Sequence, residues 1–452
     1  MKKEKGHIIN ELNFLDKKEQ ACCGLKEKKG KTSTLVNFDR IKENPAWAFE
    51  NVRSTEQWTH GYHRYPAKFL PDVVRKIIED YAQDSVRIAD LFAGCGTTLV
   101  EAKVHGIASV GTDINPVAQL ITKVKTTPLE PDDLQLAYDN LVALFNEYNE
   151  ADYADIKKHE RIDYWFTPSQ KAKIAFLYDK IYHSVIRDDM KDFFYVCISH
   201  ILKNCSWWLQ SGTKPQRDMG KKLEDPFDEF CRHCKRMMEW NKKFYEELCQ
   251  KGLLNTSCEI LLEDARHTSI PTGSINAIIT SPPYVTSYEY ADIHQLTAYW
   301  MEYISDIHEF RKKFIGSSYS GNDSLIVSDS KQAQKIVNAL SEKSKHIAHD
   351  VAQYFNDMQE VAKEMERVLA PNGHACIVIG NTKIKDVQIK SAEVFYEFLR
   401  NAGLHKVKVI KRSIPHKLMP TLRDKNTGRF TKQDNPNCKK VYPNEYVIIM
   451  KK

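Results

Sequence analysis

The chain has 452 residues, which is enough for one large domain or for a core domain with a substantial insertion. Its hydrophobic fraction of 42% and charged fraction of 28% are typical of a soluble globular protein. No apolar run approaches the ~18 residues of a membrane helix, and no apolar signal core follows the charged N-terminus, so we expect neither membrane insertion nor secretion. The net charge of +6 permits a polyanionic partner but does not require one.

The cysteines indicate a reducing compartment. Of the eleven, three lie in small or apolar surroundings typical of buried free thiols, namely Cys95, Cys197 and Cys376. Without a signal peptide a disulfide framework is not expected, so the sequence predicts an intracellular, cytoplasmic protein.

A second group of cysteines suggests zinc as an alternative role, because Cys231 and Cys234 are followed downstream by Cys249 and Cys258. However, the first two share one face of a helix expected over residues 227–240. Eight residues separate the second pair, where a zinc-binding pair has two to four. We therefore predict no metal site.

The first expected elements form a βαβ unit. Residues 1–45 are rich in Lys and Glu without a sustained period, and are expected to be a flexible arm. Residues 86–92 predict a strand, the Gly-rich turn 93–98 follows it, and a helix comes next. A second strand over residues 109–113 ends in the acid Asp113, and a second helix covers residues 116–124.

Residues 130–255 interrupt this alternation with a long, aromatic and mostly helical insertion. A helix is then expected over residues 349–369, stopping at Pro371-Asn372-Gly373. Strand-like runs cover residues 259–262, 277–280, 374–380, 407–410 and 445–450. Helices between strands predict an α/β fold with a mostly parallel, doubly wound sheet, in which the last two strands are candidates for an antiparallel pair. The expected parts are the arm (1–45), a first half (46–129), the insertion (130–255) and a second half (256–452).

The Gly-rich turn has the chemistry of a small-molecule site. Gly94 and Gly96 let the chain turn sharply and let its backbone approach a ligand closely. The following helix offers unpaired N–H groups at its start. Asp113 can accept hydrogen bonds from ribose hydroxyls. A dinucleotide-binding turn or a plain strand–helix turn is the alternative, but the third glycine of the dinucleotide fingerprint is missing.

Residues 90–98, Asp-Leu-Phe-Ala-Gly-Cys-Gly-Thr-Thr, resemble the first motif of the class I S-adenosylmethionine-dependent methyltransferases. Residues 63–71, His-Arg-Tyr-Pro-Ala-Lys-Phe-Leu-Pro, resemble the motif that precedes the cofactor strand in bacterial DNA amino-methyltransferases. An ordinary turn that opens a helix over residues 72–81 is the alternative for this stretch. The resemblance implies a Rossmann-like fold and S-adenosyl-L-methionine as the cofactor. The cofactor-binding residues that it implies are Tyr65, Lys68, Phe69, Asp90, Phe92, Ala93, Gly94, Gly96, Thr97, Thr98, Asp113, Ile114, Asp264 and Ala265.

Asp264 is included because an acid before the catalytic strand commonly contacts the adenine amino group of the cofactor in this family. It is a better candidate than its neighbour Glu263, and a solvated turn acid is the alternative reading of both.

A strand over residues 277–280 runs directly into Ser281-Pro282-Pro283-Tyr284. Two prolines fix φ and remove two N–H donors, so the loop presents carbonyl oxygens and a Ser hydroxyl with little freedom. Such acceptors suit methylation of an exocyclic amine, because hydrogen bonds to both of its N–H groups draw the nitrogen toward tetrahedral geometry. The loop resembles the (Asp/Asn/Ser)-Pro-Pro-(Tyr/Phe/Trp) motif of the amino-methyltransferases, in its Ser form.

The resemblance makes residues 281–284 the expected catalytic loop. Ser281 and the Pro282 carbonyl would accept the amine hydrogens, with Pro283 constraining the turn. Tyr284 would stack on a base flipped out of the duplex. A Pro-Pro-Tyr segment can also be a ligand of a WW-type domain, but such ligands lie in disordered segments. Methylation at cytosine C5 needs a thiolate after a proline, and the sequence contains no Pro-Cys dipeptide.

The Ser form of the motif is associated mainly with N4 of cytosine, and the Asp and Asn forms mainly with N6 of adenine. We therefore expect a site-specific cytosine-N4 DNA methyltransferase and keep adenine N6 as the alternative. The implied partners are double-stranded DNA with a specific target sequence and a cognate restriction endonuclease of a restriction-modification system. An RNA amino-methyltransferase and a catalytically idle DNA-binding protein on this scaffold are more distant alternatives. The cofactor half precedes the catalytic half, so the chain is not of the permuted kind.

Three basic segments are candidates for reading the DNA. They are the insertion, residues 311–345 after the catalytic loop, and the C-terminal residues 412–432; the insertion contributes Lys203, Lys214, Arg217 and Lys221 near Trp207 and Trp208. In better-known members the recognition region lies later, beside the catalytic strand, which leaves the assignment to the insertion open. A merely solvated basic loop is the alternative for each segment.

Overall fold

The computed structural model describes residues 36–50, 52, 56–65, 68–156, 158–209, 215–285, 290–316, 325–414, 422–424, 431, 434–440 and 444–452. The chain divides into two compact units, Met1–Ile41 and Lys42–Lys452. In the first unit the described residues hold a 3-10 turn, η1 (Phe38–Arg40), capped by the Asn37 side chain. Most of the expected arm and parts of all three candidate DNA segments lie outside the described residues, among them residues 1–35, Lys214, 317–324 and 415–421.

The second unit is built on a seven-stranded sheet with the order β3-β2-β1-β4-β5-β11-β8. Its strands are β1 (Arg87–Asp90), β2 (Ala108–Asp113), β3 (Cys258–Leu262), β4 (Ile275–Thr280), β5 (Leu369–Ile379), β8 (His405–Ser413) and β11 (Asn444–Lys451). β11 pairs antiparallel with both β5 and β8, whereas the pairs from β3 to β5 are parallel. The predicted mostly parallel sheet is therefore confirmed, with β11 running against the other strands.

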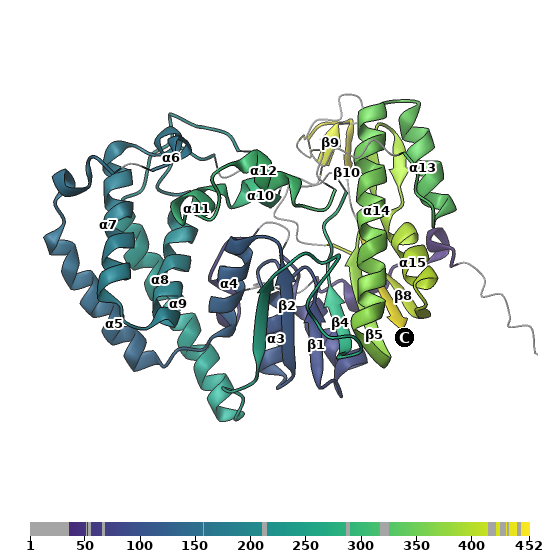
Figure 1. The fold of residues 1–452 in the computed structure, drawn as a ribbon, viewed down its shortest axis with the longest axis horizontal. Helices are drawn as coiled ribbons and strands as arrows, with labels where there is room; N and C mark the ends of the chain where they lie inside the picture. Colours follow the sequence, from purple (N-terminus) through teal and green to yellow (C-terminus); the bar gives the residue numbers. More distant parts are fainter. Residues whose placement is uncertain are drawn as a thin grey trace, which may run out of the picture. The chain divides into compact units, whose positions relative to one another are not determined.

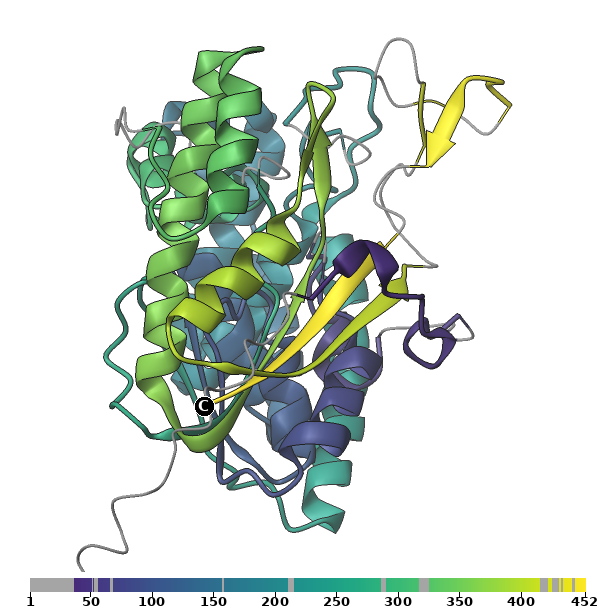
Figure 2. The ribbon, with the colours of Figure 1, turned by 90° about the vertical axis from the view of Figure 1, so that its right-hand side faces the viewer.

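Helices cover both faces of this sheet (Figures 1 and 2). On one face α2 (Pro71–Ile77) and the π turn η4 (Ile78–Ala82) form one hydrophobic cluster with alternate side chains of the central strands, including Ala277 and Ile279. α3 (Thr97–Val104) and α4 (Pro116–Thr126) continue that layer. On the other face α14 (Lys345–Val368) and α15 (Ser391–Asn401) contact β5, β8 and β11. Strands buried on both faces are apolar at successive positions, which explains their continuous apolar runs.

The insertion between α4 and β3 is largely helical, as predicted. Its elements are α5 (Pro131–Ala143), η5 (Leu144–Glu147), η6 (Glu150–Tyr153), α6 (Glu160–Trp165), α7 (Pro168–Ser184), α8 (Asp188–Ile201) and α9 (Pro226–Gln250). α7 and α9 begin where a proline at the first helical position follows a capping side chain, Thr167 or Asp225. Their apolar faces share one core with side chains of α4 and α11 (Gln295–Trp300), so the insertion packs on the sheet domain through a common hydrophobic cluster.

The remaining described elements are short helices, 3-10 turns and hairpins. They are η2 (Pro45–Trp47), η3 (Trp58–Gly61), α10 (Tyr290–Ile293), α12 (Ile307–Lys312), α13 (Lys331–Ser341) and two hairpins, β6 (Thr382–Ile384) with β7 (Val387–Ile389) and β9 (Leu422–Asp424) with β10 (Cys438–Lys440). Figure 2 shows the β9–β10 hairpin beyond the ends of β8 and β11.

Several helix and strand boundaries differ from those expected from the sequence. The helix expected to stop at Pro371-Asn372-Gly373 ends earlier, at Val368, and these three residues form a bulge inside β5. The register with β4 jumps there from Leu369 to His374, and Asn372 has a left-handed φ of 68°. Phe92 lies in the turn after β1 and not in the strand, while the helix expected over residues 227–240 extends over the whole of α9.

Cys95, Cys197 and Cys376 are buried and unpaired, as predicted. Within the part of the chain that the structure describes, no helix is both long enough and apolar enough to cross a membrane. In the same residues no three His, Cys, Asp or Glu side chains converge as a metal site would require.

Candidate active site

The Gly-rich turn leaves β1 at the centre of the sheet and leads into α3. Gly94 and Gly96 have φ values of 53° and 73°, a region that L side chains rarely adopt. A Cβ on Gly96 would also lie 2.7 Å from Thr122 Cγ2 of α4. The Thr122 hydroxyl donates a hydrogen bond to the Gly94 carbonyl at 3.1 Å. Both glycines are therefore required by the shape of the turn, which leaves a backbone cradle where a ligand can approach.

Asp113 ends β2 beside this cradle. Its two carboxylate oxygens accept hydrogen bonds from the backbone amides of Gly94 at 2.9 Å and Asn115 at 2.8 Å. Burial raises the pKa of Asp113 to about 6, although these amide bonds act in the opposite direction. A carboxylate oxygen has two lone-pair sites, so each can accept a further hydrogen bond. Asp113 therefore orders the turn and keeps capacity for ribose hydroxyls.

Asp90, at the end of β1, is committed to protein contacts. Its Oδ1 accepts hydrogen bonds from the Thr280 hydroxyl at 2.6 Å and from the Phe92 amide at 3.0 Å. The Thr98 hydroxyl in turn donates to the Ile279 carbonyl at 3.2 Å. Burial raises the pKa of Asp90 to about 6. These bonds join the Gly-rich turn to the strand that carries the Ser-Pro-Pro-Tyr loop.

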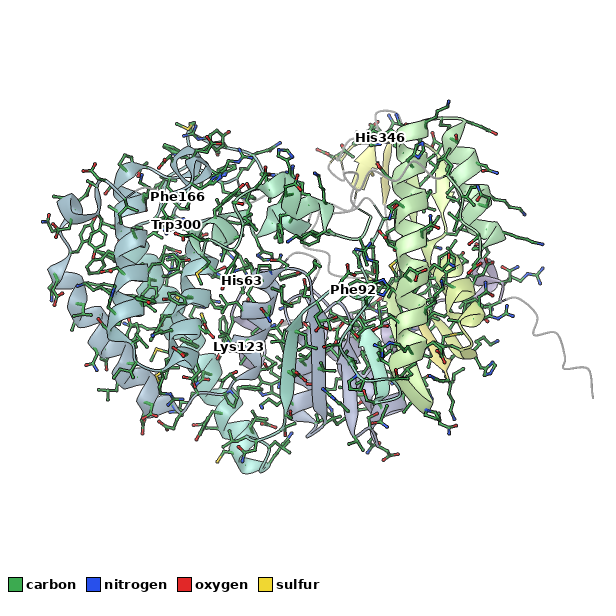
Figure 3. All side chains as sticks on the ribbon, in the orientation of Figure 1. His63, Phe92, Lys123, Phe166, Trp300 and His346 are labelled. Atoms are coloured by element: carbon green, nitrogen blue, oxygen red, sulfur yellow. The ribbon has the colours of Figure 1, made fainter. Side chains whose placement is uncertain are left out.

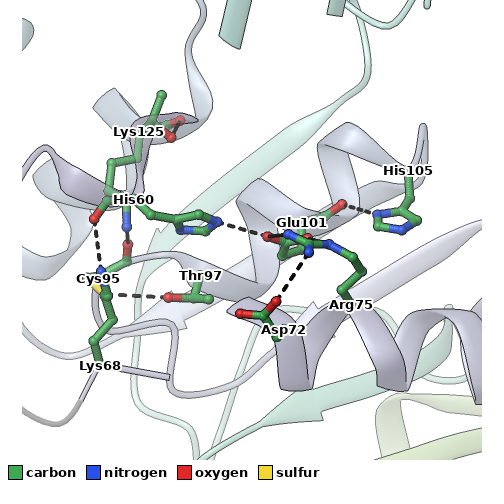
Figure 4. Close-up of polar contacts among 10 residues, drawn as sticks. His60, Lys68, Asp72, Arg75, Cys95, Thr97, Glu101, His105 and Lys125 are labelled. Carbon is green, nitrogen blue, oxygen red and sulfur yellow. Dashed lines mark hydrogen bonds and ion pairs between the residues drawn. The ribbon is translucent and has the colours of Figure 1, made fainter. Parts of the chain in front are cut away.

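A buried polar network lies beside the turn (Figure 4). Lys125 of α4 donates a hydrogen bond to the Cys95 carbonyl, and burial lowers its pKa to about 8. His60 contacts Glu101 at 2.9 Å, and Arg75 pairs with the same carboxylate at 3.2 Å. No motif in the sequence indicates these residues, because they come from four separate elements that meet only in the fold.

The residues predicted from the upstream motif have different surroundings. The Tyr65 ring lies against Gly94, 3.4 Å from the position of a Cβ there, and 5.1 Å between ring centroids from His294. Lys68 donates to the His60 carbonyl at 3.2 Å, and burial lowers its pKa. Phe69 packs against the hydrophobic cluster on the sheet. Pro66 and Ala67, part of the same motif, lie outside the described residues.

The other predicted cofactor residues surround the same strand ends. Ala93 and Thr97 are buried, Phe92 and Ile114 are half-buried, and Figure 3 shows Phe92 beside the sheet. Ala265 is buried just after β3. Burial would raise the pKa of Asp264, but hydrogen bonds from Arg266 outweigh it and hold that pKa low. Arg266 also pairs with Asp357 of α14 at 2.7 Å, which fixes Asp264 in place.

The loop after β4 presents acceptors in a defined direction. The Ser281 hydroxyl is 3.0 Å from the Val378 carbonyl of β5. Because a carbonyl can only accept, the hydroxyl must donate its proton to it, and its lone pairs are left to accept from another donor. Tyr354 of α14 donates to the Pro283 carbonyl at 2.9 Å, whereas no described residue donates to the carbonyl of Pro282.

Tyr284 is held in place by residues of β11 and β8. Its hydroxyl donates to Glu445 of β11 at 3.1 Å, and Glu445 forms an ion pair with the buried Arg412 of β8. The Arg412 Nε donates to the Trp47 carbonyl at 2.6 Å. A Cβ on Gly380 would lie 3.0 Å from the Tyr284 ring, so glycine there leaves room for the ring. The sequence gives no sign of Arg412 or Glu445 as partners of the loop.

The family model of a DNA methylase family of the N6/N4 type matches residues 2–123 and 275–452. Among curated proteins, the type II methyltransferase M.MvaI of Kocuria varians is 29% identical over 412 residues, which cover 84% of this chain and 90% of that protein. M.BsoBI of Geobacillus stearothermophilus is 26% identical over 53% of this chain and 52% of its own length. M.MjaII of Methanocaldococcus jannaschii is 37% identical over 20% of this chain and 17% of its own length.

A solved Thermus thermophilus structure, described as a putative DNA modification methylase complexed with S-adenosyl-L-methionine, covers 42% of this chain and 53% of its own at 17% identity. Its TM-score of 0.20 is too low to bear on function. The family match leaves out residues 124–274, the region of the insertion, and covers both the Gly-rich turn and the Ser-Pro-Pro-Tyr loop. Since that match extends over more than half of the sequence, the chain belongs to the N6/N4 DNA methylases, S-adenosylmethionine-dependent enzymes with the class I methyltransferase fold.

Proposed function

We propose that this protein transfers a methyl group from S-adenosylmethionine to N4 of cytosine within a specific duplex DNA sequence. We further propose that it is the modification enzyme of a type II restriction-modification system. The names of its relatives, all type II methyltransferases, support the second part. The observation that carries methylation of an exocyclic amine is the Ser281 hydroxyl, whose proton is committed to Val378 and whose lone pairs can accept an amine hydrogen. The Ser form of the motif favours cytosine.

The cofactor fits the residues at the strand ends. The Gly-rich turn would receive its methionine part, with the Tyr65 ring closing the side at Gly94. Asp113 would accept the ribose hydroxyls, and the region of Asp264 and Ala265 would meet the adenine. When bound, the cofactor supplies a sulfonium methyl group, an electrophile that needs no metal ion.

Ser281 and the Pro282 carbonyl would each accept one N–H of the target amine. With both hydrogens accepted, the nitrogen would direct its lone pair at the methyl group that the cofactor would supply, and the methylated amine would lose one proton to water. Tyr284 would stack on the flipped base, and its bond to Glu445 keeps the ring in place. The same acceptors could serve N6 of adenine, so adenine is the second candidate. The family match is compatible with both bases.

Product analysis tests this proposal. The protein is incubated with methyl-labelled S-adenosylmethionine and genomic DNA or RNA, and the nucleic acid is digested to nucleosides. We expect label in N4-methylcytosine from duplex DNA. Label in N6-methyladenine would refute the cytosine assignment, and label in RNA alone would refute the DNA substrate. DNA binding without any transfer would show an idle scaffold.

Ser281→Ala probes the acceptor directly. Removing one preorganised acceptor should lower kcat by roughly 10²-fold, with cofactor affinity nearly unchanged. Ser274→Ala is the matched control, because the Ser274 hydroxyl lies in an exposed turn before β4 and bonds only to the Pro271 carbonyl. A Ser281→Ala enzyme with the kcat of the control would contradict the role of Ser281.

A further inference from the structure

Arg217 of the insertion carries a charge that no carboxylate among the described residues neutralises. Its guanidinium lies over the Trp207 ring at 4.2 Å and over the Tyr164 ring at 4.5 Å from the ring centroids. Its Nε is buried without a hydrogen-bond partner. Among the described residues no ion pair or side-chain hydrogen bond of Arg217 is found. An arginine fixed between two rings, with unused donors, is prepared to bind an acceptor from outside the chain.

The neighbouring cations differ from Arg217 in this respect. Lys221 donates to the carbonyls of Lys203, Ser206 and Trp208. Arg232 pairs with Glu229, and Arg236 pairs with Glu56. These charges serve the internal structure of the insertion or are already paired. The unused donors of Arg217 therefore distinguish it from these three cations.

The backbone around Arg217 holds the side chain in a fixed frame. Trp208 and Arg217 form an antiparallel bridge, and the Leu209 amide donates to the Gln216 carbonyl at 2.9 Å. The Trp207 amide donates to the Trp165 carbonyl at 3.0 Å, which ties this bridge to α6. Trp208 is buried, 4.8 Å between ring centroids from Trp165. Little conformational entropy is therefore lost when Arg217 binds a ligand.

This frame continues to the segment that follows the catalytic loop. His159, just before α6, stacks on Tyr299 of α11 at 4.2 Å, and Phe166, just after α6, contacts Trp300 at 5.8 Å. Figure 3 shows Phe166 and Trp300 close together. In Figure 1, α6, α10, α11 and α12 lie on the side toward which β1 and β4 run, the side of the Ser-Pro-Pro-Tyr loop. A duplex presented to that loop would face this side.

We propose that Arg217, held between Trp207 and Tyr164, contacts the duplex DNA target. The inference rests on the proposed function and assigns part of target recognition to the insertion. The guanidinium would donate to acceptors on the DNA, either a guanine edge in the major groove or a phosphate. Both kinds of acceptor belong to the same duplex, and the experiment below distinguishes a base contact from a phosphate contact.

The test uses the full-length protein and the target sequence mapped from its own methylated DNA. Binding of target and scrambled duplexes is measured over a range of salt concentrations, together with cofactor binding and the melting temperature. Arg217→Ala should weaken target binding by about 10- to 100-fold, and Arg217→Lys should restore little of it, because lysine lacks the planar fork. Tyr164→Ala, which removes one exposed ring, should weaken target binding in the same direction. Lys222→Ala is the control, since it removes the same unit of charge from an exposed site nearby.

The pattern of loss identifies the contact. A loss confined to the target duplex supports a base contact, whereas an equal loss on both duplexes with a salt slope smaller by about one supports a phosphate contact. The inference is overturned if wild-type protein methylates DNA and Arg217→Ala binds and methylates its target as well as Lys222→Ala does. If wild-type protein methylates no DNA, the proposed function fails and this inference fails with it.

Discussion

The Tyr284 side chain is fixed at both ends, by the constrained backbone of the loop and by the hydroxyl bond to Glu445. The ring and the hydroxyl therefore have separable roles. We expect Tyr284→Ala to abolish methyl transfer, because base stacking is lost, while cofactor binding stays nearly intact. Tyr284→Phe keeps the ring and loses only the anchor, so kcat should fall by roughly 10-fold or less, in line with one hydrogen bond.

Steady-state kinetics and cofactor titration of the two variants check this prediction. If Tyr284→Phe were as inactive as Tyr284→Ala, methyl transfer would depend on the Tyr284 hydroxyl and not on the ring. Loss of cofactor binding in Tyr284→Ala would contradict the assigned place of Tyr284 on the base side of the loop.

Asp113 predicts a pH dependence of cofactor binding. Burial raises its pKa to about 6, so the carboxylate is ionised above that pH and increasingly protonated below it. Because ribose hydroxyls are best accepted by the carboxylate, cofactor affinity should be constant above pH 7 and fall by up to about 10-fold per pH unit below 6. Calorimetric titration from pH 5 to pH 8 measures this.

Asp113→Asn is the decisive variant, because an amide does not titrate. Its cofactor affinity should be weaker than that of the wild type at pH 7.5 and should change little with pH. A full pH dependence in Asp113→Asn would assign the titration to another group, of which Asp90, with a pKa raised by burial to about 6, is the first to test.

At the scale of elements, α9 is fastened to the sheet domain by one buried amide. The Asn241 side chain accepts a hydrogen bond from the Leu129 amide at 3.0 Å and donates one to the Leu129 carbonyl at 2.7 Å. Asn241 is completely buried. Its removal leaves two backbone groups without partners, and each such group costs about 1–3 kcal/mol.

Asn241→Ala should therefore lower the free energy of unfolding by roughly 2–4 kcal/mol, measured as a shift of the urea midpoint. Lys243→Ala, on an exposed position of the same helix, is the control and should change it by less than about 0.5 kcal/mol. Equal midpoints for the two variants would show that the Asn241 hydrogen bonds do not stabilise the attachment of α9.

The boundary between α14 and β5 shows what local patterns can predict at this scale. Helix and strand were both predicted, because their apolar periods differ clearly. The turn signal Pro371-Asn372-Gly373 was placed between them, but it lies within β5 as a bulge. Pairing with the parallel strand β4 places these residues inside β5, since Ile275 pairs with Leu369 before the bulge and Ala277 pairs with His374 after it.

At the scale of the whole molecule, three buried histidines and the half-buried His200 meet where the insertion joins the sheet domain. His200 of α8 stacks on His233 of α9 at 3.5 Å between ring centroids, and His63 lies 5.7 Å from His200 and 5.6 Å from His294. Figure 3 shows His63 at this junction. Burial lowers the pKa of His63 to about 3 and that of His233 to about 4, and it lowers the other two well below the ordinary value.

These histidines predict acid sensitivity. Each folded pKa is below the unfolded value of about 6.5, so below pH 6.5 the unfolded chain binds protons that the folded protein does not. The contribution of the neutral histidines to the free energy of unfolding is fully present above pH 6.5. As the pH falls from 6.5 to the folded pKa of each histidine, the free energy of unfolding decreases by up to about 1.4 kcal/mol per pH unit for that histidine. Asp90 and Asp113, whose pKa values burial raises to about 6, act in the opposite direction, but only below about pH 6.

Urea unfolding at pH 7.5 and pH 5.5 measures this difference. We expect a clearly lower midpoint at pH 5.5. His200→Gln, which cannot be protonated, should reduce the dependence on pH whatever its effect on the midpoint at pH 7.5. A midpoint that does not fall with pH in the wild type would contradict a neutral buried cluster.

The sequence by itself determined the features that depend on neighbouring residues. The apolar runs predicted the strands, the prolines at residues 282 and 283 predicted a rigid loop, and Gly94 and Gly96 predicted a turn that the structure forms with positive φ. The order of the two motifs also placed the cofactor half before the catalytic half. These features could be predicted because φ restriction and side-chain period act within a few residues.

The tertiary structure alone decided which distant groups complete the site. Thr280 bonds to Asp90, 190 positions away, Ser281 to Val378, 97 positions away, and Tyr284 to Glu445, 161 positions away. Each pairing follows from the order in which β1, β4, β5 and β11 lie side by side in the sheet. Strand order is fixed by the packing of the whole chain, because hydrogen bonding between strands is indifferent to their separation in sequence. For that reason the motifs revealed the chemistry, and only the fold showed which residues hold it in place.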